Sequence, residues 1–348
     1  MAERFLDLAP QERADILNTQ ADRLGRVSFV LEKDIWVCWV LDRLFSMPGR
    51  LKMAFKGGTS LSKVYQVIDR FSEDVDVTLD YRDLQAHFKD KGFDEAFDPL
   101  NGGVSRSQID KFMAALKDGL RTHVHGIVVP YFQAELNRDF GLGPESVEVD
   151  ATGENVRIHY PSVHTAGHGY LQKSVLIEFG GRNLTEPHEA QTVHAYAAEG
   201  LPTLAFPEAK VTVLSPSRTF WEKATLIHAE CGRESLERSV DRLSRHWYDL
   251  ALLADHAIGA RAMGEDRGLL EAVVAHKRVF YKARHADYDA CLCSHLRLIP
   301  KGALLKGLRA DYEGMQDMIF GKALVFEAVI ERLRIMEGQI NHFAIRRL

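Results

Sequence analysis

The apolar residues of the first half of the chain change their spacing several times, which indicates a mixture of strands and helices. Residues 51–55 (LKMAF) and 75–79 (VDVTL) are short apolar runs with the length and composition of buried strands. Between them, over residues 59–69, apolar positions recur at helical spacing. The pattern therefore predicts a strand, a short amphipathic helix and a second strand in quick succession.

Longer helices and further strands surround this unit. One helix is expected to begin near Pro10 and a second to cover about 32–45. A long helix is expected over about 107–137, where Pro130 should kink or split it. Further strands are expected at 145–151, 155–161 and 172–181.

The mixed pattern ends where three prolines, Pro202, Pro207 and Pro216, interrupt the chain, and the sequence beyond them is mostly helical. Strands and helices followed by helices alone indicate the α+β class. We therefore expect one domain over residues 1–210, which includes the N-terminal helices, and a mainly helical domain over 211–348.

The composition excludes several classes of protein. The 348 residues are 46% hydrophobic and 27% charged, as in ordinary globular proteins. The longest apolar run near the N-terminus is too short to span a bilayer, and the first residues lack the layout of a signal peptide. The four cysteines include no Cys-x-x-Cys pair, so they indicate reduced thiols and not a zinc or disulfide framework. We expect a cytoplasmic protein.

The charge is unevenly distributed. A net charge of −5 argues against a general binder of polyanions, but residues 277–309 are rich in bases. This stretch is either a surface that meets phosphates or simply a solvated helix face. Its bases are Lys277, Arg278, Lys282, Arg284, Arg297, Lys301, Lys306 and Arg309.

The predicted strand–helix–strand unit contains the chemistry that a nucleotide and a metal ion require. Gly57 and Gly58 precede the helix, where free backbone N–H groups favour an anion. Thr59 and Ser60 add hydroxyl donors. A phosphate group is therefore expected to bind at this turn. Lys63 and Ser72 are two further candidates to contact it, the alternatives being a solvated Lys63 and a capping role for Ser72.

Two aspartates follow on the second strand. Asp74 and Asp76 are two residues apart, so both side chains face the same side of the strand. Two neighbouring carboxylates repel each other unless a cation lies between them, and Mg²⁺ binds in this way together with substrate phosphates. Asp-x-Asp alone is weak evidence, since it also occurs on polar strand edges.

The combination FKGGTSLSK…RFSEDVDVTL (55–79) resembles the DNA polymerase β-like nucleotidyltransferases, and more narrowly the AbiEii/AbiGii toxin family. LEKDIWVCWVL (31–41), SPSRTFWEKATLIH (215–228) and RHWYDL (245–250) resemble further motifs of that family. The resemblance implies a polymerase β-like core, with a mixed sheet and helices, that is completed by the helical C-terminal half.

The resemblance also implies additional site residues. Lys223 is expected to bind the β- or γ-phosphate, and Asp249 to orient Lys223 or accept a proton. By analogy with the superfamily, Glu178 is expected to be the third carboxylate, so that Asp74, Asp76 and Glu178 would bind the metal. The alternatives are that Lys223 is a surface lysine, that Asp249 only forms a local helix pair with Arg245, and that Glu178 lies on the solvent-exposed face of its strand.

The function implied by the resemblance is transfer of NMP from an NTP to the 3′ end of tRNA, with Mg²⁺ or Mn²⁺ as cofactor, which blocks translation. The protein would then be the toxin of a type IV toxin–antitoxin, phage-abortive system. Its antitoxin would be a separate DNA-binding protein, and residues 277–309 would face the RNA. The alternatives are a nucleotidyltransferase that modifies a small molecule or a protein, and a non-catalytic NTP-binding protein.

Overall fold

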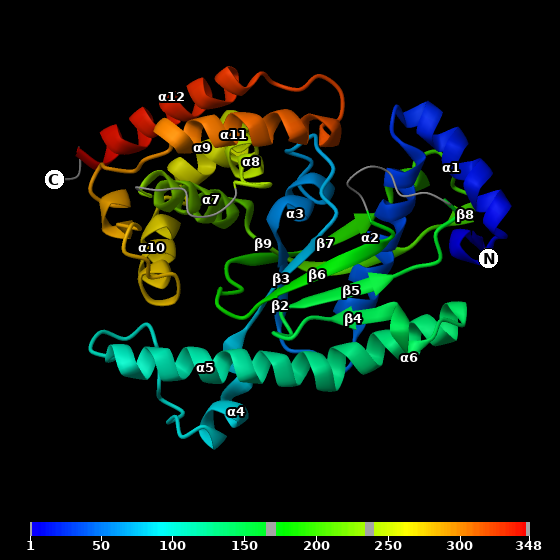
Figure 1. The fold of residues 1–348 in the computed structure, drawn as a ribbon, viewed down its shortest axis with the longest axis horizontal. Helices are drawn as coiled ribbons and strands as arrows, with labels where there is room; N and C mark the ends of the chain where they lie inside the picture. The colour runs from blue at the N-terminus through cyan, green and yellow to red at the C-terminus, as the bar shows by residue number, and fades with distance from the viewer. Residues whose placement is uncertain (1, 165–171, 234–239, 346–348) are drawn as a thin grey trace. The chain divides into compact units, whose positions relative to one another are not determined.

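The computed structural model describes residues 2–164, 172–233 and 240–345, and its chain divides into two compact units (Figure 1). The first, here called the sheet unit, comprises Met1–Val64, Ser72–Phe97 and Asp110–Leu214. The second, here called the helical unit, comprises the following segments: Tyr65–Phe71, Asp98–Ile109 and Ser215–Leu348. The protein is therefore of the α+β class, as its sequence predicts.

The sheet unit is built on a mixed sheet whose strand order is β4-β5-β6-β3-β2-β9-β7. In its centre β3 runs antiparallel to β2 and parallel to β6, and β2 is also parallel to β9. The strands are β2 (Met53–Lys56), β3 (Val75–Leu79), β4 (Val147–Val149), β5 (Asn155–His159), β6 (Ser174–Gly180), β7 (His188–His194) and β9 (Glu208–Leu214). Two short strands, β1 (Glu3–Arg4) and β8 (Leu204–Ala205), form a separate parallel pair.

Helices cover this sheet and share its apolar core with the strands. Helix α2 packs against β9 and β6, and buries the side chains of Trp36 and Trp39. Helices α5 and α6 follow one another with a single π-helical turn, Val124–Val128, between them (Figure 1). The helices in chain order are α1 (Pro10–Leu24), α2 (Ser28–Ser46), α3 (Gly57–Lys63), α4 (Gln85–Asp90), α5 (Arg106–His123) and α6 (Val129–Phe140).

The π-helical turn explains how one long helical segment accommodates Pro130. Proline lacks an N–H and clashes with the carbonyl of the preceding turn, so a regular helix cannot continue through it. The turn widens just before Pro130, which then occupies the first turn of α6. The interruption expected from the sequence is confirmed in this form.

The helix expected over residues 59–69 is wrong in its second half. Helix α3 ends at Lys63, and Gln66 has a positive φ of 51°. The backbone of the following residues bonds elsewhere: Phe71 N donates to Met318 O at 2.7 Å, and Phe320 N donates to Asp69 O at 2.9 Å. Because these bonds join residues far apart in the sequence, helical spacing could not reveal them.

The helical unit encloses its own apolar core, with α7 packed against α8, α9 and α10, and α12 against α8. Trp221 and Trp247 are fully buried in it, and their indole N–H groups donate to Ala262 O and Leu298 O. Its helices are α7 (Pro216–Cys231), α8 (Ser244–Asp255), α9 (Ala257–Met263), α10 (Gly268–Phe280), α11 (Gly302–Met315) and α12 (Phe326–Ile345). In the described part of the chain, no helix is both long and apolar enough to cross a membrane.

Candidate active site

The glycine turn and the second aspartate are in direct contact. Gly57 has a φ of +80°, and a Cβ atom built on it would lie 2.1 Å from Oδ2 of Asp76. Any other residue would therefore meet both a strained backbone and the carboxylate. The turn that begins α3 is thus held against Asp76, the residue expected to bind a metal ion.

The hydroxyl groups of this turn are engaged within the protein. Thr59 donates to the carbonyl of Asp74 at 2.5 Å and lies 2.9 Å from Oγ of Ser72. Ser60 donates to the carbonyl of Gly57 at 2.9 Å. Thr59 and Ser60 are both fully buried. In this structure they shape the turn and connect α3 to the segment before β3.

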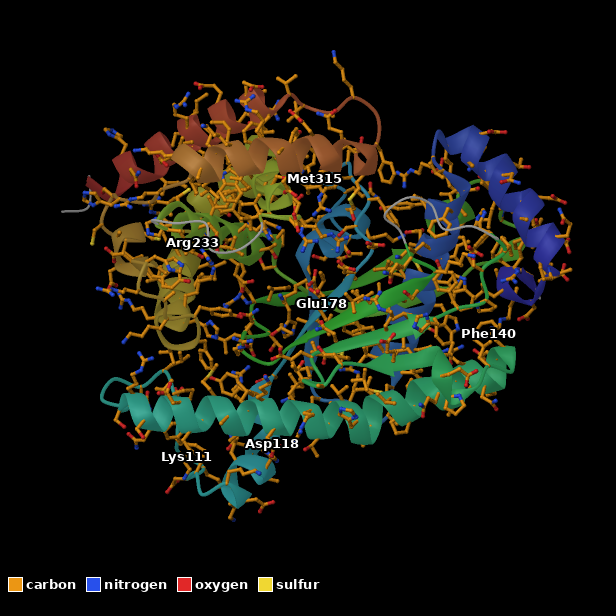
Figure 2. All side chains as sticks on the ribbon, in the orientation of Figure 1. Lys111, Asp118, Phe140, Glu178, Arg233 and Met315 are labelled. Atoms are coloured by element: carbon orange, nitrogen blue, oxygen red, sulfur yellow. The ribbon has the colours of Figure 1, made fainter. Side chains whose placement is uncertain are left out.

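The candidate carboxylates lie on neighbouring strands. Asp76 is directly opposite Glu178 in the parallel β3–β6 ladder, and Glu178 lies among the strands of the sheet (Figure 2). Asp74 is two residues before Asp76, which places it toward the same face just before β3 begins. Register thus brings together Asp76 and Glu178, and sequence spacing adds Asp74.

These carboxylates fit a site that is completed by its substrate. In the described residues, no group of three His, Cys, Asp or Glu side chains is arranged to hold a metal ion by itself. Mg²⁺ is often bound by one or two carboxylates together with substrate phosphates, and keeps several waters. Asp76, with Glu178 opposite it on β6 and Asp74 just before β3, has the oxygen donors that this type of site requires.

Lys63 differs from its expected role. Its side chain is buried, and Nζ lies 2.6 Å from Asp34 Oδ1 and 2.6 Å from the carbonyl of His194. It also lies over the ring of Tyr196. Burial would lower the pKa of Lys63, but the Asp34 carboxylate outweighs it and raises this pKa. Lys63 is therefore a structural cation at the end of α3, and it is removed from the nucleotide-binding candidates.

The other two candidates meet in the helical unit. Lys223 on α7 lies 2.9 Å from Oδ2 of Asp249 on α8, and both side chains are buried. Arg70, which comes from the segment before β3, contacts both oxygens of the same carboxylate at 2.7 and 2.8 Å. Asp249 therefore accepts hydrogen bonds from two cations that are far from it in sequence. Its contacts are not limited to the local Arg245–Asp249 helix pair that the sequence also allowed.

The electrostatics of this cluster follow from its burial. Burial alone would raise the pKa of Asp249, but the guanidinium of Arg70 and the ammonium of Lys223 hold it well below its usual range. Burial lowers the pKa of Lys223, and Asp249 opposes that effect. His246 lies 3.4 Å from Lys223 Nζ, and its pKa is lowered by burial and then by Lys223. Asp249 is therefore a charged acceptor that orients two cations.

Arg70 was not singled out by sequence reasoning. It is the arginine of the RFSEDVD lead-in, four residues before Asp74. Its place in that motif was the available signal, but its partner is 179 residues away.

The basic stretch is only partly exposed. Lys277 is buried and donates to the carbonyl of Glu222 at 2.9 Å, and Arg278 forms an ion pair with Asp289. The expectation that Lys277 faces an RNA is corrected, because its ammonium is buried within the helical unit, whereas Arg278 stays exposed. The exposed bases of the stretch are Arg278, Lys282, Arg284, Arg297, Lys301, Lys306 and Arg309.

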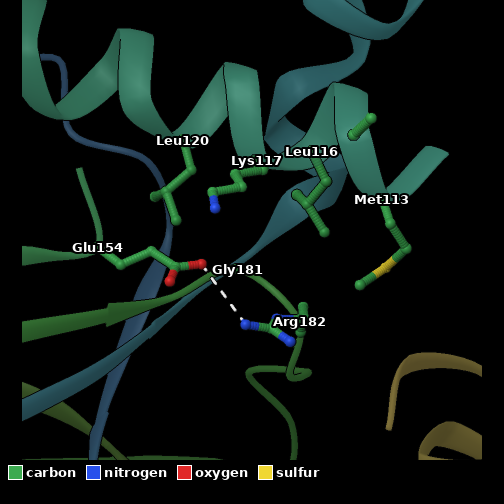
Figure 3. Close-up of a pocket in the computed structure, with 8 residues that line it drawn as sticks. Met113, Leu116, Lys117, Leu120, Glu154, Gly181 and Arg182 are labelled. Atoms are coloured by element: carbon green, nitrogen blue, oxygen red, sulfur yellow. Dashed lines mark ion pairs between the residues drawn. The ribbon is translucent and has the colours of Figure 1, made fainter. Parts of the chain in front are cut away.

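The sheet unit also contains a pocket of about 320 Å³ (Figure 3). Apolar side chains of α5 line it together with Lys117, and Glu154 and Arg182 form an ion pair of 3.6 Å at its side. None of the candidate site residues lines this pocket.

A glycine turn that closes on an aspartate of the next strand, within a mixed sheet, is the arrangement expected of a nucleotidyltransferase core. The family described as nucleotidyl transferase AbiEii toxin, type IV TA system, matches residues 39–332. The chain therefore belongs to the AbiEii family, and it is a nucleotidyltransferase toxin of the type IV toxin–antitoxin class. The family expected from the sequence motifs is confirmed.

Among the solved structures to which this chain is similar is MenT4, nucleotidyltransferase toxin Rv2826c from Mycobacterium tuberculosis H37Rv. It is 16% identical, with a TM-score of 0.43, over 94% of this chain and 98% of that chain. A search of curated proteins found no match.

Proposed function

We propose that this protein transfers NMP from an NTP to the 3′ end of a tRNA in the cytoplasm, using Mg²⁺ or Mn²⁺. The observation that carries this proposal is the contact between Gly57 and Asp76, with Glu178 in register on the adjacent strand. It combines a backbone turn that can approach a phosphate closely with carboxylates that suit a divalent ion. Membership of the AbiEii family implies the NTP substrate.

The residues of the sheet unit would bind the nucleotide and the ion. Asp74, Asp76 and Glu178 would hold the divalent cation, and the backbone N–H groups at Gly57 and Gly58 would bind phosphate oxygens. The bound cation would supply polarisation of the α-phosphate and alignment of the attacking oxygen. In the reaction, the acceptor hydroxyl oxygen would form a bond to the α-phosphorus and lose its proton to water, the bond from the α-phosphorus to the bridging oxygen would break, and pyrophosphate would leave.

The helical unit is proposed to complete the site through Lys223 and Asp249. A charged Lys223 would bind the β- or γ-phosphate, and Asp249 would orient it. Asp249 is poorly suited to accept the acceptor's proton, because its lowered pKa makes it a weak base.

Type IV membership implies a cognate antitoxin. We propose that it is a separate DNA-binding protein and that the toxin acts in phage-abortive defence by blocking translation.

The acceptor can be tested directly. Purified protein is incubated with Mg²⁺, total bacterial tRNA and each α-labelled NTP in turn, and the labelled tRNA is then treated with 3′ exonuclease. We expect label on tRNA from one preferred NTP, and its loss when the 3′ end is removed. Label on protein or on a small molecule would overturn the tRNA assignment, and NTP binding without pyrophosphate release would overturn catalysis.

A further inference from the structure

Helix α2 carries three consecutive charged residues, Glu32, Lys33 and Asp34, which are here called the α2 charge triplet. Their exposed fractions are only 2%, 2% and 1%. A buried charge is costly unless it is paired and hydrogen-bonded. Consecutive helical residues point in different directions around the axis, so each member must find its partners in a different segment.

The two outer members fasten α2 to the surrounding chain. Glu32 accepts from Oγ of Ser162 at 2.6 Å and from the backbone N–H of Val163 at 2.7 Å. Asp34 accepts from Lys63 at 2.6 Å and from the backbone N–H of Tyr196 at 2.7 Å. With both neighbours anchored in this way, the position of Lys33 is fixed.

Lys33 connects the starts of the two strands that bear the candidate carboxylates. Its ammonium forms an ion pair with Glu73, the residue before Asp74, and donates to the carbonyl of Gln172 at 3.0 Å. Gln172 is two residues before β6, the strand of Glu178. One buried ammonium thus joins the lead-in of β3 to the lead-in of β6.

This connection matters because part of the carboxylate set lies outside the regular ladder. The β3–β6 pairing fixes Asp76 opposite Glu178, but β3 begins only at Val75, after Asp74. The position of Asp74 therefore depends on contacts of the segment before β3. Lys33 supplies such a contact through Glu73, and its charge also attracts Asp74 itself.

We propose that Lys33 is a positioning residue of the nucleotidyl transfer site: by joining Glu73 to the carbonyl of Gln172 it sets the position of Asp74 relative to Asp76 and Glu178, and with it the affinity for the divalent cation. This inference rests on the proposed function, in which those carboxylates hold the cation. Lys33 itself touches neither substrate nor reacting atoms in this account.

The test compares Lys33→Met with the double variant Lys33→Met/Glu73→Met, which leaves no buried carboxylate unpaired. Mn²⁺ binding is measured by electron paramagnetic resonance in the presence of a non-hydrolysable NTP analogue, and the Mg²⁺ dependence of transfer is measured separately. Loss of a group that supports a metal ligand commonly weakens metal binding by about 10- to 100-fold. We expect a rise of that size in the Kd for Mn²⁺ in both variants.

Two further variants separate positioning from stability. Lys33→Arg keeps the charge and should retain most of the affinity for Mn²⁺. Arg43→Met removes a cation from the same helix, where Arg43 contacts Glu135 and Asp139 at 3.2 and 3.1 Å. It should leave Mn²⁺ binding unchanged.

The outcomes distinguish this inference from the function on which it rests. A wild-type Kd for Mn²⁺ in the folded double variant, in a protein that does transfer nucleotide, would overturn the role of Lys33 and leave the proposed function intact. An equal weakening in Arg43→Met would also overturn it, because the effect would then be general destabilisation. Absence of transfer by the wild-type protein would instead overturn the proposed function.

Discussion

Replacing Arg70 by methionine tests the buried cluster of the helical unit. The change removes two hydrogen bonds, of 2.7 and 2.8 Å, to a carboxylate that is completely buried. Asp249 would keep Lys223 as a partner but lose its bidentate one. Breaking a buried ion pair by removing one partner costs about 3–5 kcal/mol, because a charge is left insufficiently compensated.

The control is Arg332→Met, in the same unit. Arg332 contacts Asp255 at 2.9 Å, but both side chains are substantially exposed. Exposed ion pairs contribute about 0–1 kcal/mol. The free energy of unfolding of both variants is measured by urea denaturation followed by far-UV circular dichroism.

The expected result is a loss of stability in Arg70→Met several times larger than in Arg332→Met. A triple variant, Arg70→Met with Lys223→Met and Asp249→Leu, removes every charge of the cluster and should recover much of the lost stability. It should nevertheless remain inactive, because the proposed phosphate ligand is gone. Equal, small losses in Arg70→Met and Arg332→Met would refute the account of the cluster as a desolvated network.

Three further outcomes are expected. Gly57→Ala should abolish transfer, since its Cβ would lie 2.1 Å from Asp76 Oδ2, whereas Gly126→Ala, with nothing within 4 Å, should be tolerated in the same assay. The stabilising effect of Asp249, measured against Asp249→Asn, should be constant from about pH 8 to 5, begin to fall at about pH 4, the unfolded pKa of an aspartate, and be lost progressively as the pH approaches the lowered folded-state pKa; an effect that grew in acid would contradict it. Replacing four exposed bases by glutamate should weaken tRNA binding and flatten its salt dependence, whereas Lys277→Met should mainly reduce stability; unchanged binding would remove the RNA-facing role. The four bases are Lys282, Arg284, Arg297 and Lys301.

Local patterns predicted the local features. The strand over residues 75–79 is confirmed, because a short apolar run with turn signals on both sides is decided by neighbouring residues. The period of two also places Asp74 and Asp76 toward one face. The contact of Asp76 with Gly57 follows from two adjacent strands joined by one short helix.

Partners distant in sequence could not be predicted. Its place beside a glycine turn suggests that Lys63 binds a phosphate, but its ion-pair partner is Asp34, which lies on another helix. The sequence places Lys277 in a basic stretch, but in the structure it is buried and donates to the carbonyl of Glu222 on α7. Arg70 contacts Asp249 because residues 65–71 belong to the helical unit and not to the sheet unit that surrounds them in sequence. In each case the contact that determines the role of the residue is made with a residue too distant in sequence for periodicity to reveal it.

The Asp74–Asp76 pair is proposed to support nucleotidyl transfer. The most direct measurement is transfer of label from an α-labelled NTP to tRNA by the wild-type protein and by Asp74→Asn/Asp76→Asn, with Asp90→Asn, an exposed position on α4, as the matched control. We predict transfer by the wild type and by Asp90→Asn, and none by the folded double variant. Undiminished transfer by the double variant would contradict the assignment of this site.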